Sequence, residues 1–131
     1  MDEALYDGKG NPVAYFEDDG EHIIYLWSGY AVAYLAGDLI YGWNGSHIGW
    51  YYEGIVYDVR GQPVGSIGDK CPFALKAVRV KSAKRAKSPK FQRLPEYKRP
   101  DFRRDYGDQN LEEFLKAGAG RSIGNSSLPA K

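Results

Sequence analysis

The side chains that most often carry chemistry are scarce in this sequence. His22 and His47 are the only histidines, and Cys71 is the only cysteine. Zinc sites and cysteine nucleophiles need such residues in sets with characteristic spacings, and none of those spacings occurs here. Glycine-rich phosphate loops and the serine motif of hydrolases are missing as well. We therefore predict no catalytic residue, no metal site and no cofactor.

Aromatic side chains could form a binding site instead. The sequence has eleven Tyr and three Trp, and every Trp lies in the first half. Residues two apart on a strand share a face. Aromatic rings that share a strand face can stack on bases, sugars or peptide side chains. The alternative is that they form the core of a small domain. The candidate aromatic binding surface consists of Tyr25, Trp27, Tyr41, Trp43 and Trp50. Both strand faces are apolar, so we expect one of them to meet the tail or another subunit.

A basic segment follows the aromatic half. From Lys76 to Arg104 there are twelve Lys or Arg against two acidic residues, with prolines and aromatic residues interleaved. We expect an extended or disordered linker. Cations interspersed with rings are typical of nucleic-acid binding, through phosphate neutralisation and base stacking. The candidate residues for binding an anionic partner are Lys81, Lys84, Arg85, Lys87, Lys90, Arg93, Lys98, Arg99, Arg103 and Arg104.

The charge asymmetry of the chain allows other partners for this tail. Residues 1–70 carry a net charge of −8 and residues 71–131 carry +9, although the whole chain is only +1. The basic tail could therefore lie on its own acidic head or bind an acidic protein partner. Non-specific nucleic acid and a plain solvated linker are the alternatives, and nothing in the sequence supports readout of specific bases.

Four copies of one pattern make up the first half. Each copy begins with a tyrosine, and the spacings between these tyrosines are 19, 16 and 16 residues. A glycine follows four residues later, then a β-branched residue after three more, then Ala or Gly. The repeated positions are Tyr6, Tyr25, Tyr41 and Tyr57; Gly10, Gly29, Gly45 and Gly61; Val13, Val32, Ile48 and Val64; and Ala14, Ala33, Gly49 and Gly65. Such periodicity indicates one structural unit per copy.

Each copy predicts one β-hairpin. The flanks IIYLW and YAVAYL are β-branched and aromatic, and the turn between them contains glycine, most clearly in Asn44-Gly45. A single hairpin is marginal in water, so the four must pack together, and closure protects the strand edges. We expect a mainly β fold: an eight-stranded antiparallel meander over about residues 4–68, closed about a pseudo-four-fold axis. The tiny residues near that axis would let strands approach closely or make room for a tyrosine ring.

The pattern Tyr-x-x-x-Gly-x-x-[Val/Ile]-[Ala/Gly]-x-Φ, written four times, resembles the 4-fold beta flower domain, a bacterial family whose function is not established. The resemblance covers about residues 4–69. WG repeats, which also use a hairpin around a glycine, are more weakly similar. So are YD repeats, because copies two and three replace the Asp of Tyr6-Asp7 by Leu26 and Gly42. The resemblance implies the four-hairpin fold and brings no catalytic residues.

A short helix is predicted near residues 110–117. Asn110 is a suitable N-cap and Gly118 a suitable end. Leu111, Phe114 and Leu115 form one apolar stripe. Two turns are not stable alone, so this candidate docking helix should pack on the head, on a second copy or in a partner's groove. We thus divide the chain into a four-hairpin head, residues 1–72, and a basic extension, residues 73–131, with a disordered end.

The leading functional hypothesis is a non-catalytic binding or scaffold protein whose head positions a partner-binding tail. A nucleic-acid accessory protein that binds through the tail is the alternative. A small enzyme with an aromatic central pocket is the third, although Asp7 and Asp58, which match each other, flank turns and should cap them. The start has no signal-peptide pattern, and no apolar run reaches membrane-spanning length. We expect a cytoplasmic protein with a reduced thiol and no membrane partner.

Overall fold

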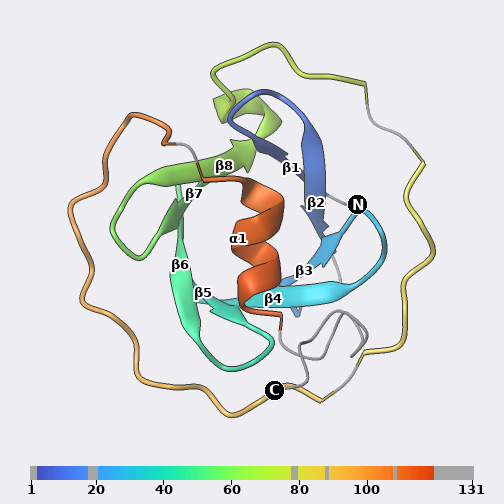
Figure 1. Cartoon of the computed structure of the whole chain (residues 1–131), viewed down its shortest axis with the longest axis vertical. Helices are drawn as coiled ribbons and strands as arrows, with labels where there is room; N and C mark the ends of the chain where they lie inside the picture. The colour runs from blue at the N-terminus through green and yellow to red at the C-terminus, as the bar shows by residue number, and fades with distance from the viewer. Residues whose placement is uncertain (1–2, 18–20, 78–79, 88, 108, 120–131) are drawn as a thin grey trace.

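The computed structural model describes residues 3–17, 21–77, 80–87, 89–107 and 109–119. Eight antiparallel strands form a closed barrel in which each strand pairs with its sequence neighbours and β8 pairs with β1 (Figure 1). The strands are β1 (Glu3–Asp7), β2 (Pro12–Phe16), β3 (Ile23–Leu26), β4 (Ala31–Ala36), β5 (Leu39–Gly42), β6 (His47–Tyr52), β7 (Ile55–Asp58) and β8 (Pro63–Ile67). The predicted meander of four hairpins is confirmed. A short 3-10 helix, Gly68–Lys70, follows β8.

All four hairpins contain the same irregularity. The strand register shifts by one residue just before each repeat tyrosine, so that Leu5 faces Ala14 but Tyr6 faces Pro12. The shift recurs in the other three hairpins. The residue skipped in the first hairpin is Val13, the repeated β-branched position. A bulge of this kind bends a strand and increases its twist. The bends accompany the outward lean of the four hairpin tips from the axis (Figure 1).

The helix α1 (Leu111–Ala117) lies across the centre of the barrel (Figure 1). The side chain of Asn110 accepts a hydrogen bond from Glu113 N and caps the first turn, as expected. Leu111, Phe114 and Leu115 are buried in one hydrophobic cluster with side chains from the barrel strands. The apolar stripe of the helix is therefore part of the core of the barrel.

The tiny repeat residues make room for this helix. A Cβ atom on Gly65 would lie 2.7 Å from Cδ2 of Leu111, and one on Gly49 would lie 2.9 Å from Cζ of Phe114. The same atom on Gly49 would also collide with the carbonyl oxygen of Tyr57 on the next strand. The small residue at position 49 therefore allows two strands to approach closely, which is the first of the two roles expected for the tiny repeat residues. The ring accommodated at Gly49 belongs to the helix rather than to a tyrosine.

The segment of residues 73–107, which we call the belt, runs around the outside of the barrel past the four hairpin tips (Figure 1). Its described residues are extended, with neither helix nor strand. At each tip a belt N–H donates to the carbonyl of the repeat glycine. The pairs are Lys76 to Gly10 (2.9 Å), Arg85 to Gly29 (3.0 Å), Leu94 to Gly45 (2.8 Å) and Arg103 to Gly61 (2.8 Å). Successive donors are nine residues apart, so the belt is a second repeat in step with the first.

No helix in the described part of the chain combines the length and apolar character needed to cross a membrane.

We predict that Phe114→Ala lowers the free energy of unfolding by about 3–5 kcal/mol, because it removes a buried ring from the barrel core. The matched control is Glu112→Ala on the exposed side of α1, where Glu112 pairs with Lys116 at 3.0 Å. The control should cost no more than about 0.5 kcal/mol. Urea unfolding of both variants checks this, and equal losses would contradict the docked position of α1.

A pair of glycines tests the contact between belt and tip. Gly45 and Gly37 both have positive φ, 90° and 64°, but a Cβ on Gly45 would collide with the belt carbonyl of Gln92, whereas nothing lies within 4 Å of one on Gly37. Gly37→Ala should cost about 1–2 kcal/mol from backbone strain alone. Gly45→Ala should cost more and should speed tryptic cleavage within the belt. Equal stability and equal cleavage rates in the two variants would mean that the belt does not hold this tip.

Candidate binding site around the barrel

The five rings proposed as an aromatic surface lie on the outer side of the barrel, beneath the belt. Tyr25, Tyr41, Trp43 and Trp50 are buried, and Trp27 is partly buried. Most of them belong to a cluster separate from the one that contains α1. Tyrosines of adjacent hairpins stack across the first two boundaries: Tyr15 on Tyr25 at 5.6 Å, and Tyr34 on Tyr41 at 6.0 Å. The belt therefore covers an aromatic face that extends over the first three hairpins.

We call the position where two neighbouring hairpins meet on the outer side a notch, and at the first two notches a ring from each hairpin forms an edge-to-face pair. Tyr15 and Trp27 make the first, with centroids 5.7 Å apart and an interplanar angle of 88°. Tyr34 and Trp43 make the second, at 6.0 Å and 87°. In the third, Trp50 is followed on the next hairpin by a valine, Val59, where the others have tryptophan.

Each notch holds one cation from the belt. Lys81 Nζ lies 4.5 Å from the ring centroid of Tyr15 and 5.4 Å from that of Trp27. Lys90 Nζ repeats this geometry, at 4.4 Å from Tyr34 and 5.6 Å from Trp43. At the third notch the guanidinium of Arg99 lies 5.8 Å from the ring of Trp50. These distances are within the range of cation–π attraction. The three cations are again nine residues apart.

A second row of belt side chains covers the repeat tyrosines. Lys84 Nζ lies 5.1 Å from the ring of Tyr25, and the Arg93 guanidinium lies 5.4 Å from that of Tyr41. At the last hairpin Phe102 takes the equivalent place and stacks on Tyr57, with centroids 4.0 Å apart and rings nearly parallel at 10°. One belt position thus uses either a cation or a ring against the same partner.

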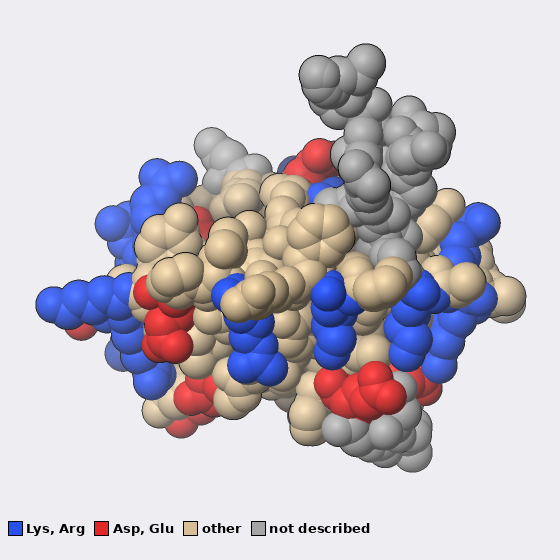
Figure 2. Space-filling view, turned by 90° about the horizontal axis from the view of Figure 1, so that it is seen from below, with Lys and Arg blue, Asp and Glu red and all other residues tan. Residues whose placement is uncertain are grey.

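The candidate basic residues divide into two groups. Lys84 forms an ion pair with Glu17, Lys87 pairs with Glu21 at 3.8 Å, and Arg85 lies over the ring of Tyr30. Others occupy the notches and the second row. Lys98, Arg103 and Arg104 are exposed and make no ion pair or ring contact with any described residue. Figure 2 shows Lys and Arg side chains in a row across one face, with acidic side chains along one side of the row.

His47 holds the belt at a point that sequence reasoning did not identify. Its Nδ1 accepts a hydrogen bond from the backbone N–H of Tyr97 at 2.9 Å, and its Nε2 lies 2.8 Å from the carbonyl of Gly49. Because Nδ1 accepts, the proton of the neutral ring is on Nε2, which donates to Gly49. The ring is buried against Trp50, with centroids 4.7 Å apart. The available signal was its place in the repeat, where the other copies have Pro12, Ala31 and Pro63.

Burial lowers the pKa of His47, although the carbonyl of Gly49 and the charge of Glu96 act in the opposite direction. Below pH 6.5 the unfolded chain therefore binds a proton that the folded chain resists, and stability must fall. We expect the unfolding free energy to decrease between pH 6.5 and pH 5, where protonation of Nδ1 also breaks the bond from Tyr97.

The variant His47→Ala, which introduces the residue found in copy two, should flatten this part of the pH dependence in urea unfolding series. His22→Asn is the control, since it removes the other, exposed histidine. A slope that disappears with His22→Asn and persists in His47→Ala would refute the assignment.

No group of three or more His, Cys, Asp and Glu side chains that could hold a metal ion occurs within the described residues.

Comparison of the chain with curated proteins and with solved structures gave no significant match. A family model described as the 4-fold beta flower protein matches residues 3–115. This range extends past the four hairpins that carry the resemblance and includes the belt and the first five residues of α1. The belt and the start of the helix are therefore within the matched family region. Since the match spans most of the 131 residues, the chain belongs to the 4-fold beta flower protein family.

Proposed function

We propose that the protein is a non-catalytic binding protein in which the β head holds the basic belt in a fixed course, and the outward cations of the belt bind an anionic partner. The observation that supports this most directly is the set of four equivalent hydrogen bonds, nine residues apart, between belt and hairpin tips. They hold the exposed cations of Lys98, Arg103 and Arg104 on an ordered backbone. A partner would then bind without the cost of ordering that segment.

The distribution of charge supports the same proposal. The acidic side chains of the head neutralise part of the belt locally, as in the pairs of Lys84 with Glu17 and Lys87 with Glu21. The remaining cations gather along the belt (Figure 2), although the net charge of the chain is only +1. A concentrated strip of one sign attracts an oppositely charged partner over about a Debye length, roughly 8 Å at physiological salt.

The aspartates that match between copies one and four support a non-catalytic role. Asp7 Oδ1 accepts hydrogen bonds from the backbone N–H groups of Lys9 and Asn11, and Asp58 Oδ1 accepts from Arg60 and Gln62. Both carboxylates hold turns, as expected. A cytoplasmic location, where thiols stay reduced, fits the free thiol of Cys71.

A nucleic acid is the candidate partner that one further observation favours. Phe91 and Tyr97 are 55% and 57% exposed on the belt, close in sequence to its cations. Exposed rings beside cations suit an unpaired strand, because its bases can stack while its phosphates are neutralised. A polyanion without bases would use only the cations.

The test is a salt titration of labelled single-stranded DNA, double-stranded DNA and heparin against the full chain. Changing Lys98, Arg103 and Arg104 together to Gln should weaken binding and reduce the salt slope for single strands by about two. The matched control changes Lys9, Arg60 and Lys70 to Gln, which removes the same charge from the head and should leave the slope unchanged. Absence of binding at low salt, or equal weakening by both triple variants, would overturn the proposal.

The same titration distinguishes the classes of partner. If bases stack on the belt, Phe91→Ala should weaken the binding of single-stranded DNA and leave the binding of heparin unchanged. Equal affinity of this variant and the unaltered chain for both polymers would exclude stacking at Phe91 and leave an anionic partner recognised by charge.

A further inference from the structure

The four-fold arrangement of belt on head is broken where β8 meets β1, which we call the seam. Each notch combines the residue nine positions after one repeat tyrosine with the residue two positions after the next. At the seam these positions are Ser66 and Gly8. Neither has a ring, so the head alone cannot make a notch there.

The belt supplies the missing ring. A Cβ atom on Gly8 would lie 2.7 Å from Cδ2 of Tyr106, so the tyrosine ring is packed directly over the glycine. The belt sequence, however, supplies no cation in the same register. Nine residues after Arg99 the sequence has an acid, Asp108, which lies outside the described residues. The seam therefore has an aromatic ring but no belt cation in the register of Lys81, Lys90 and Arg99. Lys76, in a different register of the belt, acts electrostatically on Asp7.

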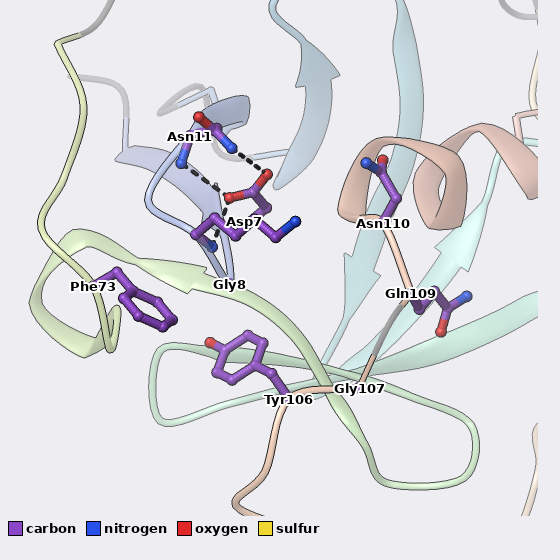
Figure 3. Close-up of a pocket in the computed structure, with 9 residues that line it drawn as sticks. Asp7, Gly8, Asn11, Phe73, Tyr106, Gly107, Gln109 and Asn110 are labelled. Atoms are coloured by element: carbon purple, nitrogen blue, oxygen red, sulfur yellow. Dashed lines mark hydrogen bonds between the residues drawn. The ribbon is translucent and has the colours of Figure 1, made fainter.

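A pocket of about 510 Å³ lies at this position, where the two ends of the belt meet the first hairpin turn. Its walls include Asp7, Asn11, Phe73, Tyr106, Gln109 and Asn110. Figure 3 shows the rings of Phe73 and Tyr106 near each other, with Asp7 and Asn11 on the first turn and the two amide side chains on the side of α1. This volume is within the range of small-molecule binding sites. Such sites are usually lined, as this pocket is, by aromatic rings and a few polar groups.

Asp7 gives the pocket a fixed negative charge. Its Oδ1 accepts from two backbone N–H groups and its Oδ2 accepts from Nδ2 of Asn11 at 2.9 Å. Burial by itself raises the pKa of Asp7, but the hydrogen bonds from Asn11 and Lys9, with the charge of Lys76, outweigh it and lower the pKa. The carboxylate is ionised at neutral pH. Lys9 also lines the pocket, but it is exposed, where water and salt screen its charge.

We propose that the seam pocket binds a small organic cation, an alkyl ammonium or a guanidinium, with the Asp7 carboxylate as counter-ion and the rings of Phe73 and Tyr106 as its aromatic faces. Gln109 also lines the pocket, and its amide oxygen is an acceptor for an N–H group of the ligand, whereas Oδ1 of Asn110 already accepts the capping hydrogen bond from Glu113 N. The three notches outside the seam are the precedent within this chain, since two hold an ammonium against a pair of rings and the third holds a guanidinium against Trp50. The ligand takes the place that the belt fills with its own side chains elsewhere.

This inference does not rest on the proposed function, because the ligand here is a cation and the belt partner is an anion. Agmatine and cadaverine are suitable probes for the cation site. The uncharged control is 1,5-pentanediol, which has the same chain length as cadaverine. A lysine amide with a blocked α-amine represents a basic peptide side chain. Amide chemical shifts of the full chain should move on titration with the amines. The shifts should be confined to the first turn, Phe73 and the end of the belt, and pentanediol should cause none.

Two variants make the test specific. Asp7→Asn keeps an acceptor for the turn but removes the charge, and should weaken amine binding at least tenfold. Asp58→Asn is its control, because Asp58 holds the equivalent turn in copy four and does not line this pocket. Phe73, which is 61% exposed, can be changed to Ala without loss of core packing and should also weaken binding.

Saturable binding of agmatine or cadaverine that is lost in Asp7→Asn and kept in Asp58→Asn supports the site. Stronger binding of the blocked lysine amide would identify a basic peptide side chain as the source of the cation, and stronger binding of the free amines would identify a metabolite. The inference is overturned if no probe gives saturable shifts up to tens of millimolar, or if the two aspartate variants weaken binding equally.

Discussion

The close approach of the belt backbone to the four repeat glycines is the contact on which the outer half of the structure depends. At each tip the glycine has a positive φ, between 87° and 99°. A Cβ atom on the glycine would collide with a belt carbonyl oxygen, and the carbonyl of the glycine itself accepts a belt N–H. Only glycine allows both contacts without strain. The glycine that turns each hairpin therefore also provides the attachment point for the belt.

The barrel is completed from two sides by the segment that follows it. On the inside, α1 fills the space left by Gly49 and Gly65 and joins the strand side chains in one core. On the outside, the belt covers the stacked tyrosines and tryptophans. The stems of Lys and Arg can lie along such rings while their charged ends remain near water. A barrel of about 65 residues has little interior of its own, and it gains apolar contacts on both faces in this way.

Symmetry makes the exceptions informative. His47 replaces a proline or alanine found in the other copies, and its ring nitrogens both bond, one of them to the belt. At the third notch Val59 occupies the position that is tryptophan in the first two, and Phe102 stacks on Tyr57 nearby. The seam departs furthest, because the head has small residues there and the belt supplies the ring of Tyr106. A binding site at the seam needs no change in the fold. It needs only the absence of the two head rings and the belt cation that are present at the first two notches.

The sequence by itself determined the four hairpins, their closure and the short capped helix. The hairpins and the helix follow from local signals, such as the turn glycines, the repeated β-branched position and the stripe of Leu111, Phe114 and Leu115. Closure follows from the need to protect the edges of the sheet. The tertiary structure decided what covers each face. The belt repeats every nine residues through its main chain, so Ala74, Ala83, Gln92 and Asp101 can occupy equivalent positions. Because these contacts use the main chain, they require no particular side chains at the repeated belt positions. The sequence therefore indicated a basic tail but not its nine-residue repeat. The seam pocket was hidden for a similar reason, since Asp7, Phe73 and Tyr106 are far apart in the chain and meet only when the belt closes around the barrel.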